Sequence, residues 1–335
     1  MTPQPPRVIS SFVAVAVIAP AVTTGVAVAL QLMAATSLPD PIAIHWGLSG
    51  AADGWGPAWL TLLLTVGVGL GLPWLLAASA VVGLRRGDRG PVYRLLAAIA
   101  AATSVFLAAL STGSVLIQQG ISAAADAPSI VPVLGLAGAL AVITGLGGWL
   151  LQPDERSTPS TRTATMDPPL GSTERAVWAR QVRLARGGLV VLGGALLLLV
   201  AVSAITIAVS DNAAVTAILL AVVVLMVATI AMTVVFQVRV DATGLAVASA
   251  AGFPRVHIPL SDIERVEVVD VSPMGEFGGW GLRWAPGGGF GVVMRSGPGI
   301  RVHRVGGKVF TVTVDDAETG AALLSAERER TEPNR

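Results

Sequence analysis

Six long apolar runs divide this chain, and the polar segments between them differ sharply in charge. The runs cover residues 8–35, 58–84, 93–118, 130–150, 187–209 and 215–237. An α-helix needs about 20 predominantly apolar residues to cross a bilayer, and each run meets that length. The pattern therefore predicts six transmembrane helices.

The arginines between the runs predict how these helices are oriented. Arg7 precedes the first run, and the segments after the second and fourth runs carry Arg85, Arg86, Arg89, Arg94, Arg156, Arg162, Arg175, Arg180, Arg183 and Arg186. Residues 37–57, 120–129 and 210–214 contain no Lys or Arg. Because cationic loops stay in the cytoplasm, we expect a plasma-membrane protein with both termini inside and these three segments outside.

Composition agrees with this architecture and excludes several kinds of chemistry. The chain is 53% hydrophobic and 13% charged, too apolar for an ordinary soluble protein of 335 residues. It has no cysteine, which excludes structural disulfides, thiolate nucleophiles and Cys-ligated metal centres. The basic residues gather beside the apolar runs. We therefore expect the lipid bilayer as a partner, and no nucleic acid.

The interior of the runs is free of ionisable residues. Ion-coupled transporters and proton relays normally place such residues within the membrane, so energy-coupled transport is not expected. The polar residues in the runs either line a path or form interhelical hydrogen bonds, the commoner use. The candidates for such a path are Thr23, Thr24, Gln31, Gln118, Ser203 and Thr206 within the runs and Gln119 directly after the third run. A passive transporter or channel for a small molecule stays open as the alternative function.

The first connection, residues 37–57, holds one compact motif. Its candidate ligand-binding or structural residues are Pro39, His45, Trp46, Asp53 and Trp55. Prolines and glycines turn the segment, and the two tryptophans suit a membrane interface. A contact between His45 and Asp53 would act as a pH-sensitive latch, because imidazole titrates near neutrality. Too few ligands are present for zinc, so no metal site is expected, and the plainest interpretation is a folded extracellular cap.

This motif resembles the domain of unknown function 1648, found in many bacterial membrane proteins. The resemblance rests on the proline-led segment, His45–Trp46 and Asp53–Gly54–Trp55, and covers about residues 15–62. Members often have a polar residue after His-Trp, where this chain has Gly47. The domain begins the Sdp-type immunity proteins, which protect producing cells from a secreted toxin and can hold a transcriptional repressor at the membrane. The resemblance implies an immunity-like scaffold with an extracellular peptide ligand.

The connection between the fourth and fifth runs divides into two parts. Residues 152–171 are rich in Pro, Ser and Thr and predict a linker. Residues 172–186 predict a helix that begins at Ser172 or Thr173. Arg175, Arg180, Arg183 and Arg186 lie on one side of this helix, and Trp178 lies on the other. Such a basic amphipathic helix would lie along the inner leaflet, and it would also serve as the positive flank of the fifth span.

The character of the chain changes after residue 237. Residues 238–240 and 245–249 flank a turn at 241–244, which predicts a hairpin. Further strands are predicted at 256–258, 265–271, 281–284, 291–295, 299–304 and 308–314, with a closing helix at 315–328. Short strands at this spacing predict a small barrel or sandwich.

The run from Ile258 to Val266, and the order of strands before one helix, resemble bacterial pleckstrin-homology-like domains over about residues 236–327. The resemblance implies a cytoplasmic PH-like barrel closed by one helix, a binding scaffold without catalytic residues. The predicted parts are helices 1–4 at residues 1–151, the linker and amphipathic helix at 152–186, helices 5–6 at 187–237 and the PH-like domain at 238–330. We expect a non-enzymatic protein without a cofactor that senses or binds outside and engages a cytoplasmic protein partner through residues 238–330.

Overall fold

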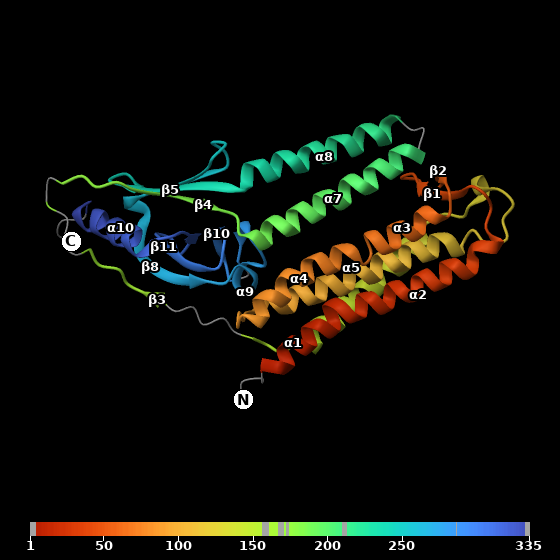
Figure 1. Ribbon diagram of the computed structural model, residues 1–335, viewed down its shortest axis with the longest axis horizontal. Helices are drawn as coiled ribbons and strands as arrows, with labels where there is room; N and C mark the ends of the chain where they lie inside the picture. The colour runs from red at the N-terminus through yellow and green to blue at the C-terminus, as the bar shows by residue number, and fades with distance from the viewer. Residues whose placement is uncertain are drawn as a thin grey trace. The chain divides into compact units, whose positions relative to one another are not determined.

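The computed structural model of the chain describes residues 5–155, 161–166, 171, 174–209, 213–285 and 287–331. It divides into two compact units. The first comprises residues 1–87, 93–154 and 193–225, and the second comprises residues 88–92, 155–192 and 226–335. The helices of the first unit and the sheets of the second are shown in Figure 1.

Helices make up most of the first unit. They are α1 (Pro5–Val13), α2 (Ala19–Ala34), α3 (Trp59–Gly67), α4 (Gly71–Arg85), α5 (Pro91–Leu116) and α6 (Val131–Leu151). Two more, α7 (Arg186–Val209) and α8 (Ala213–Thr233), contribute residues to both units. Among the described residues, six helical segments are long and apolar enough to cross a membrane: Arg7–Ser37, Trp59–Arg85, Pro91–Leu116, Val131–Leu151, Arg186–Ala208 and Ala213–Thr233. The prediction of a six-span, multi-pass membrane protein is confirmed at this level.

The first two spans are irregular where the sequence has proline. A π-helix at Ala14–Ile18 joins α1 to α2, directly before Pro20. Pro20 has no N–H to donate to the carbonyl four residues earlier, and its ring crowds that carbonyl, so the α-helical pattern opens there. Pro73 has the same effect on the second span, where α3 ends at Gly67 and α4 begins at Gly71.

Two sheets dominate the second unit. One has four strands in the order β4 (Trp178–Arg183), β5 (Val235–Asp241), β6 (Gly244–Ser249) and β7 (Arg255–Pro259). The other has six strands in the order β3 (Thr161–Arg162), β8 (Ile263–Val271), β11 (Gly297–Arg304), β12 (Val309–Thr313), β10 (Gly289–Val293) and β9 (Gly281–Trp284). Of the paired strands described, β10 and β12 run parallel and the others antiparallel.

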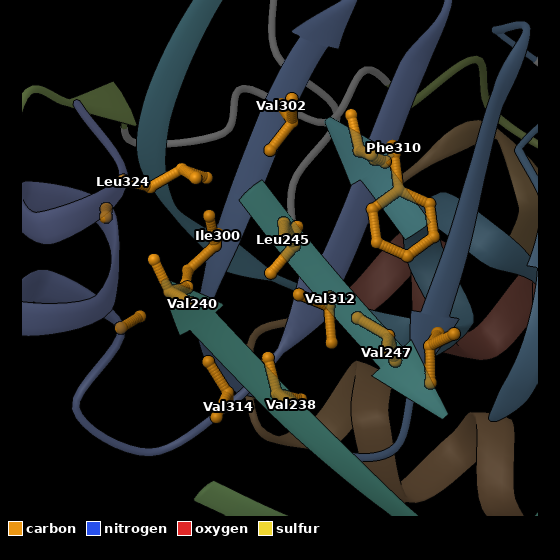
Figure 2. Close-up of a cluster of buried hydrophobic side chains, with 14 of the residues drawn as sticks. Val238, Val240, Leu245, Val247, Ile300, Val302, Phe310, Val312, Val314 and Leu324 are labelled. Carbon is orange, nitrogen blue, oxygen red and sulfur yellow. The ribbon is translucent and has the colours of Figure 1, made fainter. Parts of the chain in front are cut away.

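Alternation of apolar and polar residues builds the core of this unit. In β5, Phe236, Val238 and Val240 are buried between more exposed neighbours. These side chains meet residues of β6, β11 and β12 and of the closing helix α10 (Ala317–Thr331) in one cluster, as Figure 2 shows for Leu245, Ile300, Val312 and Leu324. The β-rich region and its terminal helix agree with the prediction. The sheets do not close into a barrel, and the pleckstrin-homology-like barrel stays a prediction.

The predicted amphipathic helix over residues 172–186 is wrong. Ser172 and Thr173, its expected first residues, lie outside the described residues, but residues 178–183 form strand β4. Trp178 and Val182 are buried in the core of the second unit rather than available to a lipid surface. Trp178 and Val182 are four residues apart, so they lie on the same face of either a strand or a helix. The sequence pattern alone therefore does not distinguish the two structures. Pairing with β5 along six residues decides for the strand.

In the sequence, the helices α7 and α8 lie between strands β4 and β5. The ladder continues to the helix ends, where Leu184 N donates to Val234 O at 2.9 Å. One residue separates Leu184 from the start of α7, and β5 begins at Val235, shortly after α8 ends. The β-rich region is therefore discontinuous in sequence and takes in β4 as well as residues 235–331.

Candidate functional site

A short hairpin follows the first span and carries the sequence motif. Strands β1 (Ile42–Trp46) and β2 (Ala52–Gly56) pair antiparallel, with register shifts beside His45. Pro39 lies half-buried in the bend before β1. The prolines and glycines thus produce a hairpin, as the predicted folded cap requires.

His45 and Asp53 face each other across this hairpin. His45 Nδ1 contacts Asp53 Oδ1, so the contact expected from the sequence is present. The two side chains are 62% and 52% exposed, which leaves both accessible to a ligand. Gly47 makes the approach possible, since a Cβ there would lie 2.8 Å from Asp53 Oδ2. A Cβ on Gly54 would lie 2.9 Å from the His45 Cβ, so a side chain at either glycine would force Asp53 or His45 to shift.

The two tryptophans of the motif differ in their surroundings. Trp46 donates from Nε1 to the carbonyl oxygen of Pro128 at 3.1 Å, which fastens β1 to the connection between α5 and α6. The backbone of Ile130 donates to Gly50 O at 3.3 Å and holds the tip of the hairpin to the same connection. Trp55 is 44% exposed. Trp46 therefore orders the hairpin, and Trp55 offers an aromatic surface.

Gln118, which lies shortly after the end of α5, anchors the hairpin through its side-chain amide. Its Oε1 accepts from Ala43 N at 2.7 Å, and its Nε2 donates to Ala43 O at 2.9 Å and to Ser114 O at 2.7 Å. The Gln118 side chain is fully buried. A primary amide can satisfy one backbone donor and one acceptor together, so Gln118 substitutes for a third strand beside β1.

A cluster of hydroxyl groups lies deeper, between α2, α3 and α5. Gln31 Nε2 lies 2.9 Å from Thr65 Oγ1 and 3.3 Å from both Ser111 Oγ and Thr112 Oγ1. These bonds join three helices and confirm the expected interhelical role of Gln31. Gln31 Oε1 is buried and has no hydrogen-bond partner among the described residues.

The hairpin and this cluster border one cavity of about 390 Å³. Ile44, His45 and Trp46 line it from β1. The helices α3 and α5 supply four polar residues, which are Thr61, Thr65, Ser111 and Ser114. The remaining wall is apolar and consists of Leu64, Val68, Leu107, Leu110, Ile130 and Leu134. An apolar pocket with a few placed polar groups is the usual form of a small-ligand site. The sequence placed His45 and Trp46 in a loop motif, but the hydroxyl residues gave no signal, because isolated Ser and Thr are common in membrane helices.

Comparison with protein families gives one match in this part of the chain. Residues 22–70 match the family model described as Domain of unknown function (DUF1648). This DUF1648 segment includes most of α2, the hairpin and α3, so the resemblance stated for the N-terminal region is confirmed. No curated protein and no solved structure was found to match the chain. The Sdp-type and pleckstrin-homology-like resemblances stay predictions.

Of the residues expected at the membrane surface, Trp178 and Arg180 both contact Asp316 near the start of α10. Arg180 Nη2 lies 2.6 Å from Asp316 Oδ2, and Trp178 Nε1 donates to the same oxygen at 3.2 Å. Arg175 is exposed in the segment before β4, Arg183 ends β4, and Arg186 begins α7. Trp178 and Arg180 therefore hold β4 to the start of α10. Among the described residues, no three His, Asp or Glu side chains are grouped as metal ligands.

Proposed function

We propose that this chain is a non-enzymatic membrane protein that binds a ligand outside the cytoplasm and engages a protein partner inside. The observation that carries the proposal is the shared cavity: His45 and Trp46 of the exposed hairpin line the same space as Thr65 and Ser111. A ligand there would meet polar groups at the hairpin and a largely apolar wall between the helices. Both the hairpin and α3 lie in the DUF1648 segment.

The position of the cavity favours binding over passive transport. Its lining residues on α5 run from Leu107 to Ser114, near the end of that helix. Two more lie at the beginning of α6, namely Ile130 directly before the helix and Leu134 in its first turn. The cavity thus occupies the hairpin end of these helices, whereas a transport path needs a polar lining along their whole length. This distribution supports a ligand pocket.

The β-rich region supplies the second half of the proposal. Two sheets and a terminal helix share one core, which suits a binding scaffold. We propose that this region is cytoplasmic, as the arginines predict, and acts as a pleckstrin-homology-like scaffold for a protein partner. The chain continues from β4 into α7 and from α8 into β5. A ligand-dependent change in these helices would therefore be transmitted through the backbone to the sheet.

Photo-crosslinking in native membranes tests the ligand site. A photoreactive amino acid in place of Leu110, inside the cavity, is compared with the same residue in place of Leu140, an exposed position on α6. We expect a distinct adduct at position 110, identified by mass spectrometry and reduced by Ser111→Phe. Ordinary phospholipid as the sole adduct at both positions would overturn the proposed ligand site.

A second experiment tests the cytoplasmic half. Partners are captured by crosslinking from cells that carry either the full chain or a chain without residues 238–335. We expect a partner that is captured by the full chain alone. An unchanged set of captured proteins would show that the β-rich region does not recruit a partner.

A further inference from the structure

The outer edge of β8 carries an extended segment from the predicted linker. Strand β3 pairs antiparallel with β8, Thr161 opposite Val269 and Arg162 opposite Val268. These two pairs involve two of the nine residues of β8. An exposed strand edge offers unpaired backbone groups, which other extended chains can use. Here a segment far away in the sequence uses them.

The side chains of this segment alternate as those of a bound peptide do. Ala164 and Met166 are half-buried against the core of the β-rich region, whereas Thr163 and Thr165 between them are exposed. Ala164 and Met166 follow Arg162 at intervals of two residues, and all three line the groove beside β8 and α10. The segment therefore presents a basic side chain followed by two apolar ones.

Arg162 recognises an acidic pair at the end of this face. Its Nη2 lies 3.8 Å from Asp270 Oδ2 on β8, and its Nη1 lies 3.4 Å from Glu318 Oε1 on α10. All three side chains are more than half exposed. Exposed ion pairs of this kind contribute little to stability, so they select a basic residue without holding it tightly.

The segment also leaves its groove incompletely filled. A cavity of about 460 Å³ remains between residues 162–166, β8 and α10. Its other walls are Val268, Glu318, Thr319 and Ala322. Ala164 is too small to occupy this space, so a peptide with a larger apolar side chain at that position would gain contacts that the chain's own segment lacks.

We propose that the groove between β8 and α10 binds an extended peptide of a protein partner, and that residues 161–166 occupy this site within the chain until the partner displaces them. The peptide adds a strand antiparallel to β8 and carries a basic residue followed, two and four positions later, by apolar residues. Strand addition supplies affinity through the backbone, and the alternating pockets supply specificity. This inference rests on the proposed function, because it assigns a surface to the cytoplasmic partner.

Binding of a labelled peptide to the full chain in lipid nanodiscs tests the groove. The probe is a fluorescein-labelled peptide with the sequence of residues 159–168, followed by fluorescence anisotropy. A tethered segment competes at an effective concentration of about a millimolar, so Arg162→Ala combined with Met166→Ala should lower the Kd of the peptide about tenfold or more. Ala164→Leu in the otherwise native chain should have the opposite effect, because it fills the cavity. Equal peptide affinity in all three chains overturns the proposal.

Charge exchange tests the specificity of the same groove. Added to the double variant, Glu318→Arg should raise the Kd of the peptide about fivefold, the effect of an exposed ion pair. A peptide with Glu in the place of Arg162 should bind this variant better than the original peptide does. Glu329→Arg, an exposed position further along α10, is the matched control and should change neither affinity. A loss of binding in the control, or none with Glu318→Arg, contradicts the assigned groove.

The remaining outcomes separate the two proposals. If the native chain is a dimer that dissociates on Arg162→Glu, the segment belongs to a second copy and the separate partner is wrong. If the peptide fails to bind but deletion of residues 238–335 still abolishes partner capture, the groove is wrong and the proposed function stands. If the peptide binds and no partner is lost on deletion, the groove stands without that function.

Discussion

The side-chain amide of Gln118 pairs with the backbone of Ala43 as a neighbouring strand would. One hydrogen bond of 2.7 Å and one of 2.9 Å join them, although they lie at the end of α5 and in the hairpin that follows the first span. The contact fixes β1 over the helices and thereby sets the position of His45 and Trp46 at the cavity. The geometry of the proposed ligand site therefore depends on a residue outside the motif.

Gln118→Leu should loosen the hairpin. The substitution leaves the buried N–H and C=O of Ala43 without these partners, at a cost of about 1–3 kcal/mol for each group. We expect faster hydrogen–deuterium exchange in residues 42–56, measured by mass spectrometry, and weaker crosslinking at position 110. Gln119→Leu is the control, because Gln119 is exposed and bonds to Ser37 at 3.0 Å. Identical exchange in both variants would show that Gln118 does not anchor β1.

Gly47→Ala should separate His45 from Asp53. The new Cβ would lie 2.8 Å from Asp53 Oδ2 and displace the carboxylate. In a double-mutant cycle of His45→Ala and Asp53→Ala, we expect a coupling of about 0.2–1 kcal/mol in the native chain, the range for exposed pairs, and none with Gly47→Ala. Gly135→Ala is the control, since nothing lies within 4 Å of a Cβ there. A coupling that survives Gly47→Ala would place the two side chains differently.

Trp178→Ala should destabilise the β-rich region strongly. Trp178 is 5% exposed within the core, and truncation of a buried Trp costs about 3–5 kcal/mol. Val177→Ala, at a neighbour that is 60% exposed, should change the free energy of unfolding by less than about 0.5 kcal/mol. Denaturant unfolding of the two variants measures the difference. Small effects of both would instead fit a residue on a membrane-surface helix.

Asp316→Asn should reduce the acid sensitivity of the same region. The Thr319 hydroxyl, the Trp178 indole and Arg180 lower the pKa of Asp316 below its ordinary value, against a smaller opposing effect of burial. A carboxyl with a lowered folded pKa stabilises the fold above its unfolded pKa of about 4, and this contribution is lost as the pH falls. Thermal unfolding is measured between about pH 7 and about pH 3, the range over which ordinary carboxyls become protonated. The melting temperature should therefore fall less steeply over this range in Asp316→Asn than in the native chain.

Thr319→Val provides the complementary measurement for Asp316. It removes the hydroxyl that contributes most to the lowered pKa, and should reproduce part of the Asp316→Asn effect. Asn is the suitable replacement at 316, because this residue has a φ of 58°, a conformation that Asn tolerates. A decline with pH as steep as in the native chain would remove Asp316 as its cause.

The sequence predicted the spans and most strands because both depend on local patterns. A bilayer demands a long apolar run, and a half-buried strand demands alternation, so the limits of the second to fifth spans and of β6, β7, β8 and β9 follow closely from residue order. The sixth span was predicted to end at residue 237, whereas α8 ends at Thr233 and residues 235–237 belong to β5. The His45–Asp53 contact was predictable for a similar reason, because only seven residues, two of them glycine, lie between the pair and a hairpin can close over them.

Tertiary contacts decided what local patterns leave open. The sequence of residues 178–183 suits a helix or a strand. They form a strand because they pair with β5, which follows them in the sequence after two intervening spans. The parallel pairing of β10 with β12 and the addition of β3 to β8 join segments that no local pattern connects. The cavity has the same origin: hydroxyls of α3 and α5 carry no signal singly, and become a site when Gln118 holds the hairpin over them. Periodicity thus determines which residues a segment buries, whereas packing between distant segments determines against what they are buried.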